Sequence, residues 1–402
     1  MKSILLKPGR DRSLRFRHPW VFSGAVAQLQ GQPEAGETIA VRAPQGDFLA
    51  QAAYSPISKI AARVWTWDQS ERVDADFFRR RLQGALDMRR ALVPEEETNA
   101  VRLVHAESDG LPGLVVDRYD DLLVVQFLSA GAEYWREVLV QQLVDLTGIR
   151  QVYERSDVEV RSLEGMPERD GALAGGDIGA PRPIRENGLT FLVDPTRGQK
   201  TGFYIDQRRN RKRLGELSAG RDVLNCFCYT GAFSVYAVAG GARSVLSIDS
   251  SAEALALGRA NMAANQMEGQ NAEWLEADVF QALRSLREQE RRFDLIVLDP
   301  PKFAPTAAQV ERAARGYKDI NLQAFRLLRP GGLLFTFSCS GGVSTELFQK
   351  IVMGASLDAV EDSETPGTIS PRIVEHLSQG VDHPVALNFP EGAYLKGLIC
   401  AV

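Results

Sequence analysis

The sequence predicts an α/β protein built from three parts. From about residue 200, short apolar segments alternate with helical patterns, as in a parallel sheet covered by helices on both faces. The first 70 or so residues instead resemble short strands separated by turn dipeptides, and a mixed segment lies between these regions. A chain of 402 residues is also longer than one ordinary domain, which favours several domains.

The composition is that of a globular protein, with 44% hydrophobic and 25% charged residues. No apolar run is long enough to span a bilayer and the N-terminus lacks a signal-peptide core, which argues against membrane and secreted proteins. The four cysteines fit neither the spacing of a zinc site nor a disulfide framework. We therefore expect no metal site, reduced thiols and a cytoplasmic location.

The N-terminal part is expected to form a small β-rich module with strands at Ile4–Leu6, Ile39–Arg42, Phe48–Tyr54 and Ile60–Trp65. Although the net charge is −5, residues 1–30 hold six Lys or Arg against one acid. Interleaved with these cations are Phe16, His18, Trp20 and Phe22. Cations bind phosphates and flat rings stack on bases, so this mixture favours RNA binding. Two further basic clusters, residues 79–81 and 208–213, are equally compatible with solvated helix faces.

The middle segment is expected to begin with a helix at residues 74–92. Strands follow at Val101–His105, Leu114–Tyr119 and Leu122–Leu128, then a helix at Ala132–Leu146 and a strand at Gln151–Glu154. Residues 164–180 are rich in Gly, Ala and Pro, which predicts a flexible loop or linker. Asn187-Gly188 lies within Ile184–Val193 and predicts a hairpin.

The C-terminal part is expected to hold strands at Asp222–Phe227, Ser244–Asp249, Glu273–Asp278, Phe293–Asp299 and Leu333–Ser338. Helical patterns fill residues 231–240, 251–267, 279–290 and 307–329. Ligands of such sheets bind at the carboxyl ends of the strands. The residues at these ends therefore carry the functional prediction.

The first three strand ends are typical of an adenosine pocket. A turn of small residues from Asn225 to Gly231 leads into a helix whose N-terminus favours anionic groups. Asp249 ends the second strand, where a carboxylate can accept both ribose hydroxyls; the alternative is a helix N-cap. Asp278 ends the third strand and can accept the adenine amino group, with Phe280 against the ring. The glycine fingerprint of dinucleotide enzymes is absent, which disfavours a dehydrogenase.

The fourth strand ends in Asp299-Pro300-Pro301-Lys302-Phe303. Two prolines hold the backbone away from helix and fix the flanking side chains. A polar group beside a flat aromatic ring suits a nitrogen heterocycle lifted out of its stack. The alternative is an ordinary loop.

Cys339 lies in the glycine-bounded segment that ends the fifth strand. Carbon 5 of a pyrimidine cannot attack a methylsulfonium directly, but a thiolate added to carbon 6 makes the ring enamine-like and nucleophilic. Beside the prolyl loop, Cys339 is therefore predicted to be a nucleophile rather than a small buried hydrophobe. Cys226 and Cys228 lie two residues apart and are expected on a strand, facing the same side. They are interpreted as packing or pocket-lining residues, and Cys400 as a residue of a late strand.

Four motifs resemble a known family, the RlmI-like bacterial 23S rRNA cytosine-C5 methyltransferases, over essentially the whole chain. Residues 18–25 (HPWVFSGA) resemble its N-terminal PUA domain, and residues 107–114 (ESDGLPGL) resemble its central α/β domain. Residues 199–208 contain QKTGFY and DQR, similar to the entry to the catalytic domain and the edge of the methyl-donor pocket. Residues 389–397 (FPEGAYLKG) resemble the C-terminal signature.

The resemblance implies a PUA-like domain at residues 1–72, a central α/β domain at 73–182 and a Rossmann-like methyltransferase domain at 183–402. It implies S-adenosylmethionine as the cofactor and 23S ribosomal RNA as the partner, with a homodimer as a candidate assembly. The donor contacts expected are Lys200, Thr201, Phe203, Asn225, Tyr229, Thr230, Gly231, Asp249, Asp278 and Val279. The target base is expected against Asp299, Pro300, Pro301, Lys302 and Phe303, with Cys339 and Asp299 as catalytic residues.

Three carboxylates, Asp299, Asp382 and Glu391, are candidates for the base that removes the proton from carbon 5, and the sequence does not rank them. Two other functions stay open. One is an RNA methyltransferase acting on an exocyclic nitrogen or on carbon 5 of uracil. The other is a non-catalytic RNA-binding or assembly protein with a vestigial cofactor fold.

Overall fold

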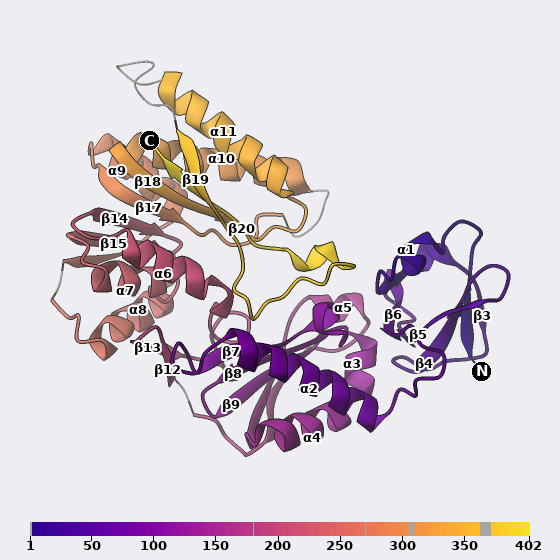
Figure 1. The fold of residues 1–402 in the computed structure, drawn as a ribbon. Helices are drawn as coiled ribbons and strands as arrows, with labels where there is room; N and C mark the ends of the chain where they lie inside the picture. The colour runs from indigo at the N-terminus through magenta and orange to yellow at the C-terminus, as the bar shows by residue number, and fades with distance from the viewer. Residues whose placement is uncertain (1, 180, 270, 305–308, 362–370) are drawn as a thin grey trace. The chain divides into compact units, whose positions relative to one another are not determined.

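The computed structural model describes residues 2–179, 181–269, 271–304, 309–361 and 371–402, and Figure 1 traces the chain. By their contacts the residues form two compact units. Unit 1 contains Met1–Gly188, Val193–Ile205 and Val381–Gly392, and unit 2 contains Leu189–Leu192, Asp206–Gly380 and Ala393–Val402. Each unit is assembled from separate stretches of chain, so the predicted boundaries at residues 72 and 182 stay a prediction.

The N-terminal part of unit 1 is a six-stranded sheet in the order β2-β6-β5-β4-β1-β3. Its strands are β1 (Ser3–Leu6), β2 (Trp20–Phe22), β3 (Val26–Gln30), β4 (Thr38–Arg42), β5 (Phe48–Tyr54) and β6 (Ile60–Thr66). The short helix α1 (Arg12–Arg15) lies between the first two strands. Buried aliphatic side chains such as Ile4, Ile39 and Val64 form its core. The four predicted strands are confirmed, whereas β2 and β3 were not predicted.

The central part of unit 1 contains a five-stranded sheet in the order β11-β10-β9-β8-β7. Its strands are β7 (Ala100–His105), β8 (Leu114–Tyr119), β9 (Leu122–Phe127), β10 (Gln151–Ser156) and β11 (Arg169–Ala174). The helices are α2 (Ala75–Leu92), α3 (Ala130–Tyr134), α4 (Arg136–Thr147) and α5 (Val160–Leu163). Asp74 caps α2 by accepting a hydrogen bond from the Phe77 amide, which explains where this helix begins.

Two predictions for this segment were wrong. Residues 164–180, expected to be a loop, contain the edge strand β11, which pairs antiparallel with β10; Ala180 lies outside the described residues. The ladder of backbone hydrogen bonds orders this strand although its sequence lacks an apolar alternation. The single helix expected at Ala132–Leu146 is two helices, α3 and α4, which meet at Trp135.

A predicted hairpin follows the five-stranded sheet. It consists of β12 (Arg182–Glu186) and β13 (Leu189–Val193). The turn residues Asn187 and Gly188 have φ values of 50° and 81°. Positive φ at both central residues is what a two-residue type I′ turn requires, so this prediction is confirmed.

Unit 2 contains a seven-stranded mixed sheet in the order β16-β15-β14-β17-β18-β20-β19. Its strands are β14 (Asp222–Cys226), β15 (Ser244–Asp249), β16 (Ala272–Glu276), β17 (Phe293–Leu298), β18 (Leu328–Ser338), β19 (Arg372–Leu377) and β20 (Lys396–Ala401). Strands β14 to β18 pair in parallel, and β20 is antiparallel to both β18 and β19. The strand order reverses between β14 and β17, where ligands of such sheets bind.

Helices cover both faces of this sheet (Figure 1). The short 3-10 helix η3 (Ile205–Gln207) leads into α6 (Arg208–Glu216), which packs with α7 (Ala232–Ala239), which packs with α8 (Ala252–Ala264). Helix α10 (Val310–Leu327) packs with both α9 (Val279–Glu288) and α11 (Thr345–Glu361). The predicted parallel sheet with helices between its strands is confirmed, and residues 307 and 308 of the predicted helix lie outside the described residues.

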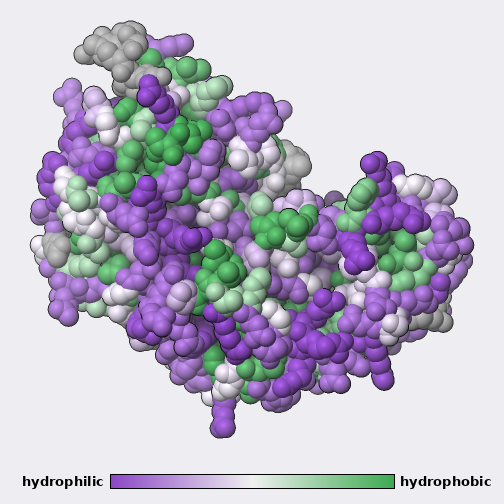
Figure 2. All heavy atoms as spheres, viewed as in Figure 1, coloured by the Kyte–Doolittle hydropathy of each residue, from purple (hydrophilic) through white to green (hydrophobic). Residues whose placement is uncertain are grey.

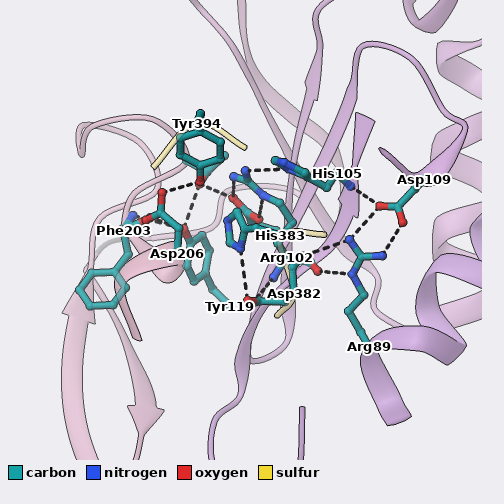
Figure 3. Close-up of polar contacts among 12 residues, drawn as sticks. Arg89, Arg102, His105, Asp109, Tyr119, Phe203, Asp206, Asp382, His383 and Tyr394 are labelled. Carbon is teal, nitrogen blue, oxygen red and sulfur yellow. Dashed lines mark hydrogen bonds and ion pairs between the residues drawn. The ribbon is translucent and has the colours of Figure 1, made fainter. Parts of the chain in front are cut away.

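A buried polar network in unit 1 holds the distant segment 381–392 to α2 and β7 (Figure 3). The Arg89 guanidinium donates to both oxygens of Asp109, at 2.6 and 2.8 Å, with both side chains almost completely buried. Arg89 also donates to the backbone oxygen of Asp382, at 3.0 Å, and the Asp382 carboxylate accepts from the Arg102 amide at 3.2 Å. These bonds explain why residues 381–392 belong to unit 1.

We expect Arg89→Ala to lower the free energy of unfolding by about 3–5 kcal/mol, because it leaves the Asp109 carboxylate buried without its partner. Urea unfolding followed by circular dichroism measures this change. The matched control is Arg90→Ala, which removes the exposed neighbour that pairs with Asp87 and should change the free energy of unfolding by less than about 1 kcal/mol. Equal effects of the two substitutions would contradict the structural role of Arg89.

Candidate active site

The predicted functional residues of unit 2 lie along one edge of its sheet. Strands β14 to β18 are parallel, so their carboxyl ends meet at the same edge. Asn225 is the last residue but one of β14, and Asp249 is the last residue of β15. The residues that follow β16, β17 and β18 include Asp278, Asp299 and Cys339. The pairing of the strands therefore gathers residues that are up to 114 positions apart in the sequence.

The turn after β14 has an unusual backbone. Phe227, Tyr229 and Gly231 all have positive φ, at 57°, 48° and 70°. A non-glycine residue in this region costs on the order of 1–3 kcal/mol, and such strain gathers at ligand sites. The turn is held by the Cys228 amide, which donates to the Ile248 oxygen, and by the Tyr229 amide, which donates to Asp249 Oδ2 at 2.8 Å. Cys228 therefore lies in the turn and not on the strand, which corrects its predicted placement.

Gly231 is required here by both conformation and space. A Cβ atom at this position would lie 2.4 Å from the ring of Trp274 and 3.4 Å from the Cα of Gly258. Gly231 is also the residue before the first turn of α7, so the first free amides of this helix lie beside the turn. Close packing and free amides together suit a ligand that approaches the backbone.

Two buried polar atoms beside this turn have no hydrogen-bond partner among the described residues. They are Asn225 Oδ1 and Thr230 Oγ1. The other end of the Asn225 amide donates to Ser234 Oγ at 2.8 Å, which fixes its orientation. Leaving a buried polar atom unpaired costs about 1–3 kcal/mol, and a polar ligand recovers this free energy. These atoms are the observation that fits a bound nucleoside donor.

The two acids have different local roles. Asp249 accepts from the Tyr229 and Ser251 amides, and the N-cap of α8 is Ser251, so the alternative interpretation of Asp249 as a helix cap is wrong. Asp249 keeps further lone pairs for ribose hydroxyls. Asp278 is exposed and caps α9 by accepting from the Gln281 amide at 3.0 Å. Val279 is buried as the first residue of that helix.

The remaining predicted donor contacts, Lys200, Thr201 and Phe203, belong to unit 1. The Thr201 hydroxyl donates to Asp117 Oδ2 at 2.6 Å. The Phe203 amide donates to the Tyr119 hydroxyl at 3.2 Å (Figure 3). Burial raises the pKa of Tyr119 well above its usual value, so its hydroxyl stays protonated. Their contact with the donor stays a prediction.

Asp299 is held by a chain of side-chain amides. Gln207 Nε2 donates to Asp299 Oδ2 at 2.9 Å, and Gln207 Oε1 accepts from Asn210 Nδ2 at 2.6 Å. Asn210 also donates to the Ser378 oxygen at 3.1 Å. This order of donors and acceptors fixes which end of the buried Gln207 amide faces the carboxylate. Sequence reasoning missed both amides in this role, because Gln207 lies 92 residues from Asp299.

The prolyl loop after β17 and the cysteine loop after β18 are joined directly. The Ala304 amide donates to Ser340 Oγ at 3.1 Å. In the prolyl loop Pro300 is buried, Pro301 and Lys302 are exposed, and Phe303 is half-buried. The Phe303 ring packs against Tyr317 of α10 with 4.7 Å between ring centroids. The loop therefore offers one flat ring and one fixed carboxylate beside Cys339.

Cys339 differs from the other three cysteines, all of which lie in the described part of the chain. Cys226, Cys228 and Cys400 are buried, whereas Cys339 is partly exposed. Burial raises the pKa of Cys226 and of Cys228 well above the usual range, and that of Cys400 to about 12. These three thiols therefore stay protonated near neutral pH, which leaves Cys339 as the reactive candidate.

The two basic clusters at residues 79–81 and 208–213 are only partly solvated helix faces. In the 208–213 cluster, Arg208 and Arg211 are 1% exposed, so this part of α6 is not a solvated face. Arg213 pairs with Glu375 and Glu216, and these hydrogen bonds raise its pKa. The side chains of Arg80 and Arg81 on α2 are more exposed and pair with Glu71.

Two of the four N-terminal rings face solvent. Phe16 is 71% exposed and Phe22 is 48% exposed, and the Arg12 guanidinium lies 5.8 Å from the centre of the Phe16 ring. The other two rings pack inside unit 1. Trp20 lies against Phe389 and donates to Glu107, and His18 pairs with Glu391.

The described residues contain no helix that is long and apolar enough to cross a membrane, and no group of three or more His, Cys, Asp or Glu that could hold a metal ion. On the face seen in Figure 2, hydrophilic residues predominate and hydrophobic residues form separate patches.

The sequence of this chain is similar to two domain families and to several proteins of known function. The pattern of S-adenosylmethionine-dependent methyltransferases matches residues 167–371, and that of PUA-like domains matches residues 4–67. Ribosomal RNA large subunit methyltransferase I of Shewanella amazonensis is 51% identical over 399 residues, which cover 99% of each chain. The protein of the same name from Aeromonas hydrophila is 50% identical over 398 residues, 99% of this chain and 98% of the relative.

Solved structures show the same fold. A Streptococcus mutans chain described as a SAM-dependent methyltransferase has a TM-score of 0.85 at 22% identity, with 100% of each chain covered. A methyltransferase complexed with SAH has a TM-score of 0.86 at 22% identity, also with 100% of each chain covered. The predicted fold class and the predicted cofactor, S-adenosylmethionine, are confirmed by the domain matches.

We expect Gly231→Ala to weaken S-adenosylmethionine binding by at least about tenfold, or about 1.4 kcal/mol. The new Cβ would push against Trp274 and strain a residue with φ of 70°. Isothermal titration calorimetry measures the affinity. The matched control is Gly220→Ala, where φ is 68° and no atom lies within 4 Å of the added Cβ, so the affinity should be unchanged. An equal loss in both variants would show that general destabilisation is the cause.

Proposed function

Because the chain belongs to the ribosomal RNA large subunit methyltransferase I family, we propose that it methylates carbon 5 of a cytosine in 23S ribosomal RNA through a covalent bond between Cys339 and carbon 6. The chain is an S-adenosylmethionine-dependent methyltransferase. The choice of base, the choice of carbon 5 and the covalent step are the proposed parts.

The partial exposure of Cys339, at the end of β18 and beside the prolyl loop, supports this chemistry. A methyltransferase that modifies an exocyclic nitrogen needs no thiol nucleophile. A free cysteine without such a role is usually buried, as the other three cysteines are. The Ala304–Ser340 hydrogen bond holds the thiol next to the loop that is expected to grip the base.

The proposed reaction has three steps on the base. The Cys339 thiolate adds to carbon 6, which makes carbon 5 nucleophilic. S-adenosylmethionine, when bound, would supply a methyl group on a positively charged sulfur. As carbon 5 forms its bond to the methyl carbon, the bond between that carbon and the sulfur would break and leave a neutral thioether. A base then removes the carbon 5 proton, and the bond between Sγ and carbon 6 breaks to restore the aromatic ring and the thiolate.

Asp299 is the base that the geometry favours. It lies on the loop joined to the cysteine loop, and the hydrogen bond from Gln207 to its Oδ2 fixes the orientation of the carboxylate that would accept the proton. The two other candidates have local partners in unit 1. Asp382 is completely buried beside His383 and the Arg102 amide, and Glu391 pairs with His18.

The PUA-like part supplies the proposed RNA contact. Exposed Phe16 and Phe22 and the surrounding arginines offer rings to bases and cations to phosphates. An enzyme acting on ribosomal RNA works where ribosomes are made, so we include a cytoplasmic location in the proposal. A homodimer stays a prediction, and size-exclusion chromatography with light scattering tests it.

We expect an RNA carrying 5-fluorocytosine to form a covalent adduct with the protein when S-adenosylmethionine is present. Fluorine cannot leave carbon 5 as a proton does, so the final elimination is blocked. Intact-mass spectrometry should detect the adduct, and peptide mapping should place it on Cys339. The adduct should be absent from Cys339→Ala and present in Cys400→Ala. Methylation of unmodified RNA without any adduct would favour amino-group transfer instead.

We expect Phe16→Ala to weaken binding of a ribosomal RNA fragment by about 5- to 150-fold, because base–aromatic stacking contributes about 1–3 kcal/mol per base. Fluorescence anisotropy measures the dissociation constant. The matched control is Leu357→Ala, which removes a comparably exposed apolar side chain from α11 of unit 2. Unchanged affinity of the Phe16 variant would remove this ring from the RNA surface.

A further inference from the structure

Lys396 is a buried lysine for which the described residues provide no acidic partner. It is the first residue of β20 and is 8% exposed. Within the described residues its ammonium group makes one hydrogen bond, to the Ser340 oxygen at 2.8 Å, and lies within ion-pair distance of no carboxylate. Removing an ammonium from water costs several kcal/mol unless an opposite charge compensates it. A counter-charge for Lys396 is therefore expected nearby.

The backbone around Lys396 directs it to Cys339. Lys396 lies opposite Ser338 in the antiparallel pairing of β20 with β18, and its Nζ bonds to Ser340. Cys339 lies between these two serines in the sequence, so Lys396 contacts both neighbours of the nucleophile. These four residues all belong to unit 2.

Two other titratable groups among the described residues, Tyr317 and Lys302, interact with this pair. Tyr317 of α10 donates to or accepts from Ser340 Oγ at 3.0 Å, and burial raises the pKa of its hydroxyl, so it stays neutral. Lys302 of the prolyl loop acts on Lys396 as a like charge. Burial lowers the pKa of Lys396, a negative charge on Cys339 raises it, and Lys302 lowers it further.

We propose that Lys396 is a positioning residue that activates Cys339, by forming an ammonium–thiolate pair with it. This inference rests on the proposed function of Cys339 as the nucleophile. One proton is shared in the pair: it moves from Sγ to the neutral Nζ amine, which gives a thiolate and an ammonium and requires no other base. The proton stays on Nζ while Sγ adds to carbon 6.

The pair also assists the end of the reaction. When Sγ is bonded to carbon 6 its negative charge is gone, and the buried Lys396 ammonium has lost its counter-charge. Elimination of Cys339 as a thiolate restores the pair. The same lysine therefore stabilises the thiolate both as nucleophile and as leaving group.

The test measures alkylation of Cys339 by iodoacetamide at a series of pH values, in the full chain without RNA or donor, with the modified cysteine mapped by mass spectrometry. We expect Lys396→Met to slow alkylation at pH 7 by about tenfold or more and to move the midpoint of the pH–rate profile upward, since an opposite charge within a few ångströms favours the thiolate. Lys396→Arg keeps the charge and should keep the profile. The control is Lys350→Met, an exposed lysine of α11.

An unchanged profile in Lys396→Met would overturn the proposal and assign Lys396 a purely structural role at Ser340. S-adenosylmethionine binding shows whether Lys396→Met is folded. If this variant does not bind it, a comparison of the wild type with Cys339→Ala tests the proposal instead. Nuclear magnetic resonance of 13Cε-labelled lysine should then show the Lys396 titration midpoint lower in Cys339→Ala than in the wild type. Equal midpoints would overturn the proposal as well.

The failure of the proposed function gives a different result. A shifted alkylation profile with no 5-fluorocytosine adduct would leave the Lys396–Cys339 pair established and carbon 5 chemistry refuted.

Discussion

The site depends on the parallel hydrogen-bonded pairing of β17 with β18. After an irregularity between Phe293 and Leu295, this pairing keeps one register from Leu295 opposite Leu333 to Leu298 opposite Thr336, so both strands end at the same edge. A slip of one residue would turn every following side chain to the other face of the sheet. The Ala304–Ser340 bond then closes the two loops that extend beyond the ladder. This register fixes the relative positions of Asp299, Cys339 and Phe303.

Several features that lower stability lie at this edge. The turn after β14 contains two non-glycine residues with positive φ, Asn225 and Thr230 each leave a buried oxygen unpaired, and Lys396 is a buried cation. Positive φ at non-glycine residues and unpaired buried atoms also occur elsewhere in the chain, but here they coincide with the predicted ligand contacts, which indicates a function. A bound donor satisfies the unpaired oxygens, and a thiolate compensates the lysine. The strain and the unpaired groups are therefore explained by ligands and chemistry rather than by the fold.

The positions of the strand ends could be predicted from the sequence, because the carboxyl ends of parallel strands lie at the same edge of the sheet. Asp249, Asp299 and Cys339 could be predicted to lie along that edge once the alternation of strands and helices was recognised. Gln207 and Lys396 could not be predicted in their roles, since their partners lie 92 and 56 residues away and neither residue ends a parallel strand. The missed strands β2 and β3 and the misassigned strand β11 lie at sheet edges, where a strand pairs on one side only.

Burial makes three of the four cysteine thiols harder to deprotonate. Three thiols lie among apolar side chains or beside Asp249, where a negative charge on sulfur is disfavoured. The fourth lies one residue beyond the end of β18, where the ladder ends and a lysine from the antiparallel strand β20 faces the loop. β20 interrupts the parallel order of the sheet, and this reversed direction places the start of β20, where Lys396 lies, beside the carboxyl end of β18. The antiparallel strand thus brings its first residue, Lys396, to the edge where the parallel strands end.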